Sequence, residues 1–212
     1  MWWARVRSPT TSPVLLDTQL VFSLSGMTSG SWLQRGKITE IVGPLGSGRT
    51  SVLVALLRDV TRAGGVAALV DADATFDPVT AARAGVMLER LLWIRCDGRR
   101  EAAVAAVDLL ARCPGFALVA LDAGETPPRL TLPRAFRLRQ AARRADVALV
   151  LVGRHRIAGA GAALAVRTCR EALAWAGPRR RPTRLLGMGT ALQVMRSQGA
   201  PPASIEHRWW TA

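Results

Sequence analysis

A glycine-rich segment between a strand pattern and a helix pattern constrains this chain more than any other feature. Residues 37–42 have the apolar content of a strand, and Gly43-Pro44-Leu45-Gly46-Ser47-Gly48-Arg49-Thr50 follows directly. A helical spacing of apolar residues then runs from Val52 to the glycine pair that begins at Gly64. Glycines let the backbone turn its N–H groups inward, and the helix start adds its dipole, so such a loop can hold a polyphosphate. The order of strand, loop and helix therefore predicts a P-loop.

The chemistry of this loop departs from the P-loop pattern at one position. Arg49 stands where the pattern has lysine, and a broad, planar guanidinium is a poor substitute for a compact ammonium between terminal phosphates. Thr50 is placed to ligate Mg²⁺. Two interpretations stay open: a loop kept only for its fold, or a loop that binds a nucleotide weakly through backbone N–H groups alone. We expect that no cofactor is required; ATP and Mg²⁺ are the candidate ligands of the second interpretation.

The rest of the chain alternates strand and helix patterns up to Gly153. The expected strands are 37–42, 66–70, 91–94, 116–121 and 147–152. One further helix is expected to begin near residue 78, and two more are expected at 98–112 and 132–144. Continuous apolar strands between helices predict a mostly parallel sheet that is covered on both faces. Strand-rich stretches follow at 163–175, 184–188 and 191–196, and the first 30 or so residues have no clear pattern. We predict an α/β fold with a short antiparallel C-terminal extension.

An acidic residue ends the strand pattern at 116–121. The run Leu118-Val119-Ala120-Leu121-Asp122 is an apolar strand that closes in a carboxylate, and in P-loop proteins such an aspartate holds Mg²⁺. The nucleotide-binding candidates are Gly43, Gly46, Ser47, Gly48, Arg49, Thr50 and Asp122.

Several separate segments, in the right order, resemble the RecA recombinase core. Residues 38–50 resemble its strand and P-loop, and 70–79 (Val-Asp-Ala-Asp-Ala-Thr-Phe-Asp-Pro-Val) are similar to the stretch after its next strand. Residues 116–122 resemble its Walker B strand, and 147–159 its following strand and loop. The resemblance implies a RecA-like P-loop core at 31–160. The segment 1–30 then precedes it as a candidate interface, and 161–212 is a strand-rich extension of the same domain.

The departures from the RecA pattern concern the catalytic positions. The glutamate that polarises the attacking water falls on Asp73, which is one methylene shorter. The glutamine that senses the γ-phosphate falls on Arg154 or nearby, within Gly153-Arg154-His155-Arg156. A displacement of about 1 Å can cost roughly 100-fold in rate. Since Arg49 also replaces the lysine, we expect that ATP turnover is not the function; Asp73 remains as a degenerate catalytic candidate.

The size, the core motifs and these losses resemble the ImuA/SulA-like group of bacterial SOS-response proteins. That resemblance implies a non-catalytic accessory protein of translesion DNA synthesis, located in the cytoplasm at the nucleoid. Its implied partners are RecA, an ImuB-type polymerase homologue with an error-prone replicative-type polymerase, and DNA. A RecA-paralogue DNA-dependent ATPase and a basic DNA-binding module are the alternatives.

Charge is concentrated in the second part of the chain. Of the net +14, residues 127–212 contribute +13, from 16 basic and 3 acidic side chains. Such a basic surface suits nucleic acid or an acidic partner, although a solvated helix face has the same appearance. The DNA- or partner-binding candidates are Arg137, Arg154, Arg156, Arg179, Arg180 and Arg181. The three cysteines have no paired spacing that indicates a metal site, and no apolar run is long enough to span a membrane.

Overall fold

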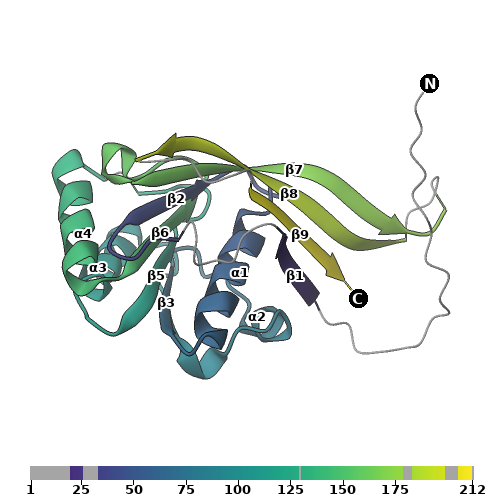
Figure 1. Ribbon diagram of the computed structural model, residues 1–212, viewed down its shortest axis with the longest axis horizontal. Helices are drawn as coiled ribbons and strands as arrows, with labels where there is room; N and C mark the ends of the chain where they lie inside the picture. The colour runs from purple at the N-terminus through teal and green to yellow at the C-terminus, as the bar shows by residue number, and fades with distance from the viewer. Residues whose placement is uncertain (1–19, 26–32, 129, 179–182, 199–204, 212) are drawn as a thin grey trace.

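The computed structural model describes residues 20–25, 33–128, 130–178, 183–198 and 205–211, with nine strands in one sheet (Figure 1). The strands are β1 (Leu20–Ser25), β2 (Ile38–Val42), β3 (Val66–Asp71), β4 (Leu91–Arg95), β5 (Phe116–Asp122), β6 (Ala148–Gly153), β7 (Leu164–Ala176), β8 (Arg184–Ser197) and β9 (Ile205–Thr211). The α-helices are α1 (Arg49–Arg62), α2 (Pro78–Arg83), α3 (Arg100–Leu110) and α4 (Leu132–Ala145), and two 3₁₀ turns are η1 (Leu88–Arg90) and η2 (Gly159–Gly161). The predicted α/β fold is confirmed.

The sheet has a parallel part and an antiparallel part. Its order is β1-β9-β8-β7-β2-β6-β5-β3-β4, and every pair from β7 to β4 is parallel. The pairs β7–β8, β8–β9 and β1–β9 are antiparallel. Because β2 lies between β6 and β7, the loop after β2 lies where the parallel core meets the antiparallel extension.

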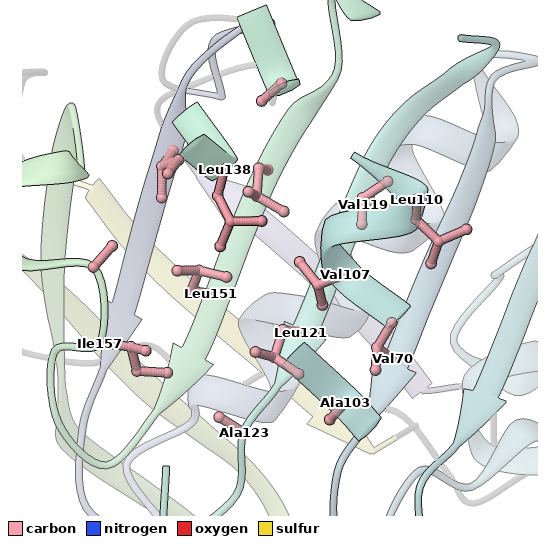
Figure 2. Close-up of a cluster of buried hydrophobic side chains, with 14 of the residues drawn as sticks. Val70, Ala103, Val107, Leu110, Val119, Leu121, Ala123, Leu138, Leu151 and Ile157 are labelled. Carbon is pink, nitrogen blue, oxygen red and sulfur yellow. The ribbon is translucent and has the colours of Figure 1, made fainter. Parts of the chain in front are cut away.

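Helices cover both faces of the parallel part, as continuous apolar strands require. On one face, α1 and α2 pack on strand residues such as Leu69 and Leu118. On the other face, α3 and α4 supply Val107 and Leu138, which lie over Leu121 and its neighbours (Figure 2). Alternate residues of one strand therefore enter two separate cores.

A buried aspartate organises the turn that leads from β3 to α2. The side chain of Asp71 accepts hydrogen bonds from the backbone N–H groups of Thr75 (3.1 Å) and Phe76 (2.9 Å) and from the indole N–H of Trp93 (3.3 Å). Asp77 then caps α2, and its hydrogen bond from the Thr80 hydroxyl lowers the pKa of this carboxyl. The expected helix start at residue 78 is confirmed.

The C-terminal part differs from the sequence prediction in its strand lengths. Residues 184–188 and 191–196 were expected as two stretches, but β8 is one strand of 14 residues that continues through Gly189. Pairing with β7 on one side and β9 on the other satisfies the backbone there, so the glycine does not end the strand. Figure 1 shows the long β7–β8 pair reaching past the helical layers.

Two strands of the antiparallel part, β1 and β9, had no clear signal in the sequence. Residues 20–25 lie within the stretch that lacks a pattern, and they form β1, which pairs with β9. Residues 199–202 (Gly-Ala-Pro-Pro), whose composition predicts a turn, lie outside the described residues. Among the described helices, none is long and apolar enough to cross a membrane.

Candidate nucleotide site and its basic surroundings

The loop between β2 and α1 has the left-handed glycines that a P-loop needs. Gly46 (φ +73°) and Gly48 (φ +91°) adopt conformations that disfavour other residues, and Gly48 is the N-cap of α1. The N–H of Ser47 donates to the carbonyl of Pro44 at 3.2 Å, which closes the turn. The Thr50 side chain is exposed at the start of α1. The loop therefore turns at two left-handed glycines immediately before α1.

Two threonines of the antiparallel extension pack directly against the loop. A Cβ on Gly43 would lie 2.1 Å from the hydroxyl oxygen of Thr168 in β7, and a Cβ on Gly48 would lie 2.1 Å from that of Thr190 in β8. The hydroxyls of Ser47 and Thr168 are 2.6 Å apart and share a hydrogen bond. The glycines are thus needed for packing against β7 and β8, apart from any role toward phosphate.

The arginine at the position of the P-loop lysine contacts two groups of this chain, a backbone carbonyl and a carboxylate. The Arg49 side chain is buried, with 6% of its surface exposed, and its Nη1 donates to the carbonyl oxygen of Gly43 at 2.7 Å. Its Nη2 forms a salt bridge with the Glu125 carboxylate, which the Arg154 guanidinium also approaches, at 3.7 Å. Since Glu125 lies in the loop after β5, this pair ties the loop to the Walker B edge of the sheet. The Arg49 guanidinium can contact a phosphate only after its salt bridge with Glu125 breaks.

The carboxylate at the end of β5 is buried. Asp122 is 8% exposed, and its Oδ1 accepts one hydrogen bond, from the backbone N–H of Gly124 at 3.1 Å. Burial raises the pKa of Asp122, and the nearby Asp71 and Asp73 raise it further, while the Gly124 N–H and Arg49 lower it. Removing this carboxylate from water has a cost that a structural role alone does not explain.

The aspartate that stands for the catalytic glutamate is held by a cation. Asp73 forms a salt bridge with Arg100 at the start of α3. Its carboxylate also packs closely on Gly124, where an added Cβ would lie 1.7 Å from Oδ2. The Nη1 of Arg100 is buried and has no partner among the described residues. Asp73 is therefore directed toward α3 and Gly124.

A basic pocket of about 700 Å³ opens beside the loop. Its walls include the backbone from Gly43 to Ser47, together with Arg154, Arg167 and Arg170. Arginines beside a glycine-rich loop form a chemically suitable site for a phosphate-bearing ligand. Arg156 also lines the pocket, but its Nε donates to the buried Glu40 at 2.8 Å.

The predicted DNA- or partner-binding arginines that the structure describes lie in two places. Arg154 and Arg156 lie at the pocket, whereas Arg137 lies on α4. Arg179, Arg180 and Arg181 lie outside the described residues.

Sequence reasoning missed the residues that hold these groups in place. Glu125, Arg100, Thr168 and Thr190 are single polar residues without a motif, and only Glu125, three residues after the Walker B aspartate, had a usable signal. Arg167 and Arg170 were counted only in the net charge. In the part of the chain that the structure describes, no cluster of three metal-ligating side chains occurs.

The fold defines an α/β protein with a parallel core covered by helices on both faces, and comparison with known proteins specifies the family. The model of the RecA N-terminal domain matches residues 18–129, which is more than half of the chain. The chain belongs to the RecA family, and the predicted RecA-like core is confirmed.

Individual relatives agree with this assignment. The chain is 40% identical to the protein RecA of Picosynechococcus sp. over 93 residues, which are 44% of this chain and 26% of the relative. It is 37% identical to that of Prochlorococcus marinus over 118 residues, 56% of this chain and 29% of the relative. The matched segments thus span less than a third of the relatives' length.

Proposed function

We propose that this chain is a RecA-like accessory protein of DNA repair that does not turn over ATP. The observation that carries the proposal is the engagement of Arg49, whose guanidinium contacts the Gly43 carbonyl and the Glu125 carboxylate. In this arrangement the only cation at the P-loop lysine position is neutralised by an acid of the same chain. Binding ATP then requires breaking a mostly buried ion pair, which costs free energy.

The other catalytic positions support the same proposal. Asp73 is shorter than the glutamate it replaces and is paired with Arg100. Arg154 stands in the place of the γ-phosphate-sensing glutamine and lies 3.7 Å from Glu125. Efficient hydrolysis needs these groups within a fraction of an ångström of the reacting atoms. Three independent departures at one site favour a role that depends on binding.

Within the RecA family, we place the chain in the ImuA/SulA-like group of SOS-response proteins. In this role it acts in translesion synthesis, docks on RecA or on an ImuB-type polymerase homologue, and weakens or caps RecA filaments. An error-prone replicative-type polymerase would then work beside it. The preserved RecA-like core supports the proposal, because a related core can offer a related interface to RecA.

The decisive experiment follows RecA filaments on single-stranded DNA. RecA, ATP and the DNA are mixed with increasing amounts of this protein, and filament length is measured by electron microscopy while binding is measured by light scattering. We expect shorter filaments at substoichiometric amounts. No binding to RecA together with unchanged filaments would refute the proposal.

A DNA-dependent ATPase is the second candidate, and the shape of the loop favours it. Gly46 and Gly48 keep their left-handed conformations, and Thr50 is exposed. Phosphate release, measured with and without single-stranded DNA, decides between the two functions. Turnover that is abolished by Asp122→Ala would establish the ATPase, whereas the accessory role predicts no turnover above the level of that variant.

A further inference from the structure

A second concave site lies on the helical side of the molecule, along the outer face of α4 and the end of α3. It has a volume of about 750 Å³ and is separate in residue content from the pocket beside the loop. We name it the α3–α4 groove. Its principal lining residues are Arg112, Pro114, Pro133, Phe136, Arg137 and Arg144.

The α4 side of the groove is one face of a helix. Pro133, Arg137, Gln140 and Arg144 are exposed and recur at helical spacing. The opposite face of α4 packs Leu138 and neighbouring alanines into the core. The groove face of α4 is therefore available to another molecule while the buried face maintains the fold.

The floor of the groove is apolar. Phe136 is half-buried, and Ala141 and Ala145 continue the apolar surface along α4. Pro114 closes the α3 end, and its nitrogen has no hydrogen to donate. The guanidinium of Arg139 lies 4.6 Å from the centre of the Phe136 ring and occupies one of its faces. An apolar side chain can rest on this floor, beside a ring of which one face already contacts a cation.

Among the described residues, no acidic side chain pairs with two of the groove's arginines. Arg112 forms a bidentate contact with Asp108 on its own helix. No salt bridge reaches Arg137 or Arg144 from the residues that the structure describes. These two are seven positions apart on α4, which is about 10 Å along the axis at 1.5 Å per residue. Carboxylates one heptad apart on a second helix match this separation.

We propose that the α3–α4 groove docks an acidic amphipathic helix of a partner protein. Apolar side chains of that helix lie on Phe136 and the alanines, and two carboxylates one heptad apart pair with Arg137 and Arg144. This is the helix-in-groove mode of recognition, with charge complementarity setting the register. The proposal does not rest on the function of the nucleotide site, because it uses none of the residues there.

The test uses the full chain and a designed probe. The probe is a fluorescein-labelled, alanine-based peptide of about 18 residues, long enough to hold helical structure. It carries two leucines four positions apart and two glutamates seven positions apart. Fluorescence anisotropy measures its affinity, and a second peptide with serines for the leucines and an oligothymidylate of similar length serve as comparison ligands.

Arg144→Glu is tested against Arg143→Glu, which makes the same charge change at an exposed neighbour that does not line the groove. We expect saturable binding of the leucine peptide that falls about fivefold in Arg144→Glu and roughly 25-fold in Arg137→Glu/Arg144→Glu, because the two ion pairs are independent, and that stays within about twofold in Arg143→Glu. The serine peptide should bind more weakly.

Three results would overturn the proposal. Equal losses in Arg144→Glu and Arg143→Glu would reduce the binding to net charge. Preferential binding of the oligothymidylate, weakened by Arg144→Glu, would assign the groove to nucleic acid. No saturable binding of the leucine peptide would remove the docking site.

Discussion

Two groups of buried charged side chains lie near strand β2, and they differ in how fully their polar atoms are satisfied. In the Glu40 group, the carboxylate is 1% exposed and accepts hydrogen bonds from the N–H groups of Ile157 and Ala158, both at 2.6 Å, and from Arg156 at 2.8 Å. In the phosphate-loop group, Asp122 accepts one hydrogen bond, and Arg49 depends on a partner, Glu125, whose side chain is 37% exposed.

The difference separates a group whose buried polar atoms are well supplied with partners from a group whose buried polar atoms have few. The Glu40 group fixes the turn after β6, and three hydrogen bonds engage both oxygens of its carboxylate. The phosphate-loop group keeps a buried carboxylate with a raised pKa and a cation held by a loop residue. Incomplete satisfaction of buried groups is typical of sites that bind something, or that descend from such a site.

The largest expected effect is on stability at Glu40. Glu40→Ala leaves two backbone N–H groups and the Arg156 guanidinium without their acceptor, and we expect a loss of about 3–5 kcal/mol in the free energy of unfolding. Urea unfolding followed by circular dichroism measures it.

The control for this variant is Glu101→Ala. Glu101 is exposed and pairs with Arg134 on the surface, so its loss should cost less than about 1 kcal/mol. Similar losses for the two variants would contradict the structural role of Glu40.

The next effect concerns nucleotide affinity at Glu125. Glu125→Ala frees the Arg49 guanidinium, so we expect affinity for ATP with Mg²⁺ to rise about tenfold, or roughly 1.4 kcal/mol. Equilibrium dialysis with labelled ATP measures the change. Glu89→Ala, at an exposed acid in η1, has the same loss of charge and should leave the affinity unchanged. An affinity that is the same in both variants would show that Glu125 does not restrain the loop.

A smaller effect is expected at Asp122, with a defined dependence on pH. Because burial raises the pKa of Asp122 in the folded chain, folding favours the protonated form. The contribution of Asp122 to stability is fully present below its pKa in the unfolded chain. It is lost as pH rises through its pKa in the folded chain. Asp122→Asn keeps the acceptor for the Gly124 N–H and carries no charge. It should therefore raise the free energy of unfolding at pH 7 by on the order of 1 kcal/mol.

Thermal melts of both proteins across a pH series test this expectation. The advantage of Asp122→Asn should shrink toward acid, where the wild-type carboxyl is protonated too. An advantage that grows toward acid would mean that the folded chain stabilises the ionised form.

The smallest effect compares the two threonines that contact the loop. Thr168→Val removes hydrogen bonds to Ser47 (2.6 Å) and to the carbonyl of Val42 (3.3 Å), and should cost about 1 kcal/mol. The buried hydroxyl of Thr190 has no partner among the described residues, so Thr190→Val should be neutral or slightly stabilising. Urea unfolding of the two variants measures both changes in the free energy of unfolding. Equal losses would contradict the inference that only the Thr168 hydroxyl is hydrogen-bonded.

Sequence patterns predicted the parallel core because its signals are local. An apolar run such as residues 116–121 indicates a buried strand wherever its partners lie, and the spacing of Gly46 and Gly48 after a strand indicates the loop. The antiparallel part was less predictable: β1 pairs with β9 across most of the chain, and β8 continues through Gly189 because strands on both sides supply hydrogen bonds.

The sequence by itself determined the RecA-like core, the replacement of lysine by Arg49 and the carboxylate at Asp122. Only the tertiary structure decided what those side chains contact. Glu125 meets Arg49 because the loop after β5 and the loop after β2 lie at the same edge of the sheet, and Thr168 meets Ser47 because of the register between β2 and β7. Such contacts depend on strand order and register, which a single sequence does not encode locally.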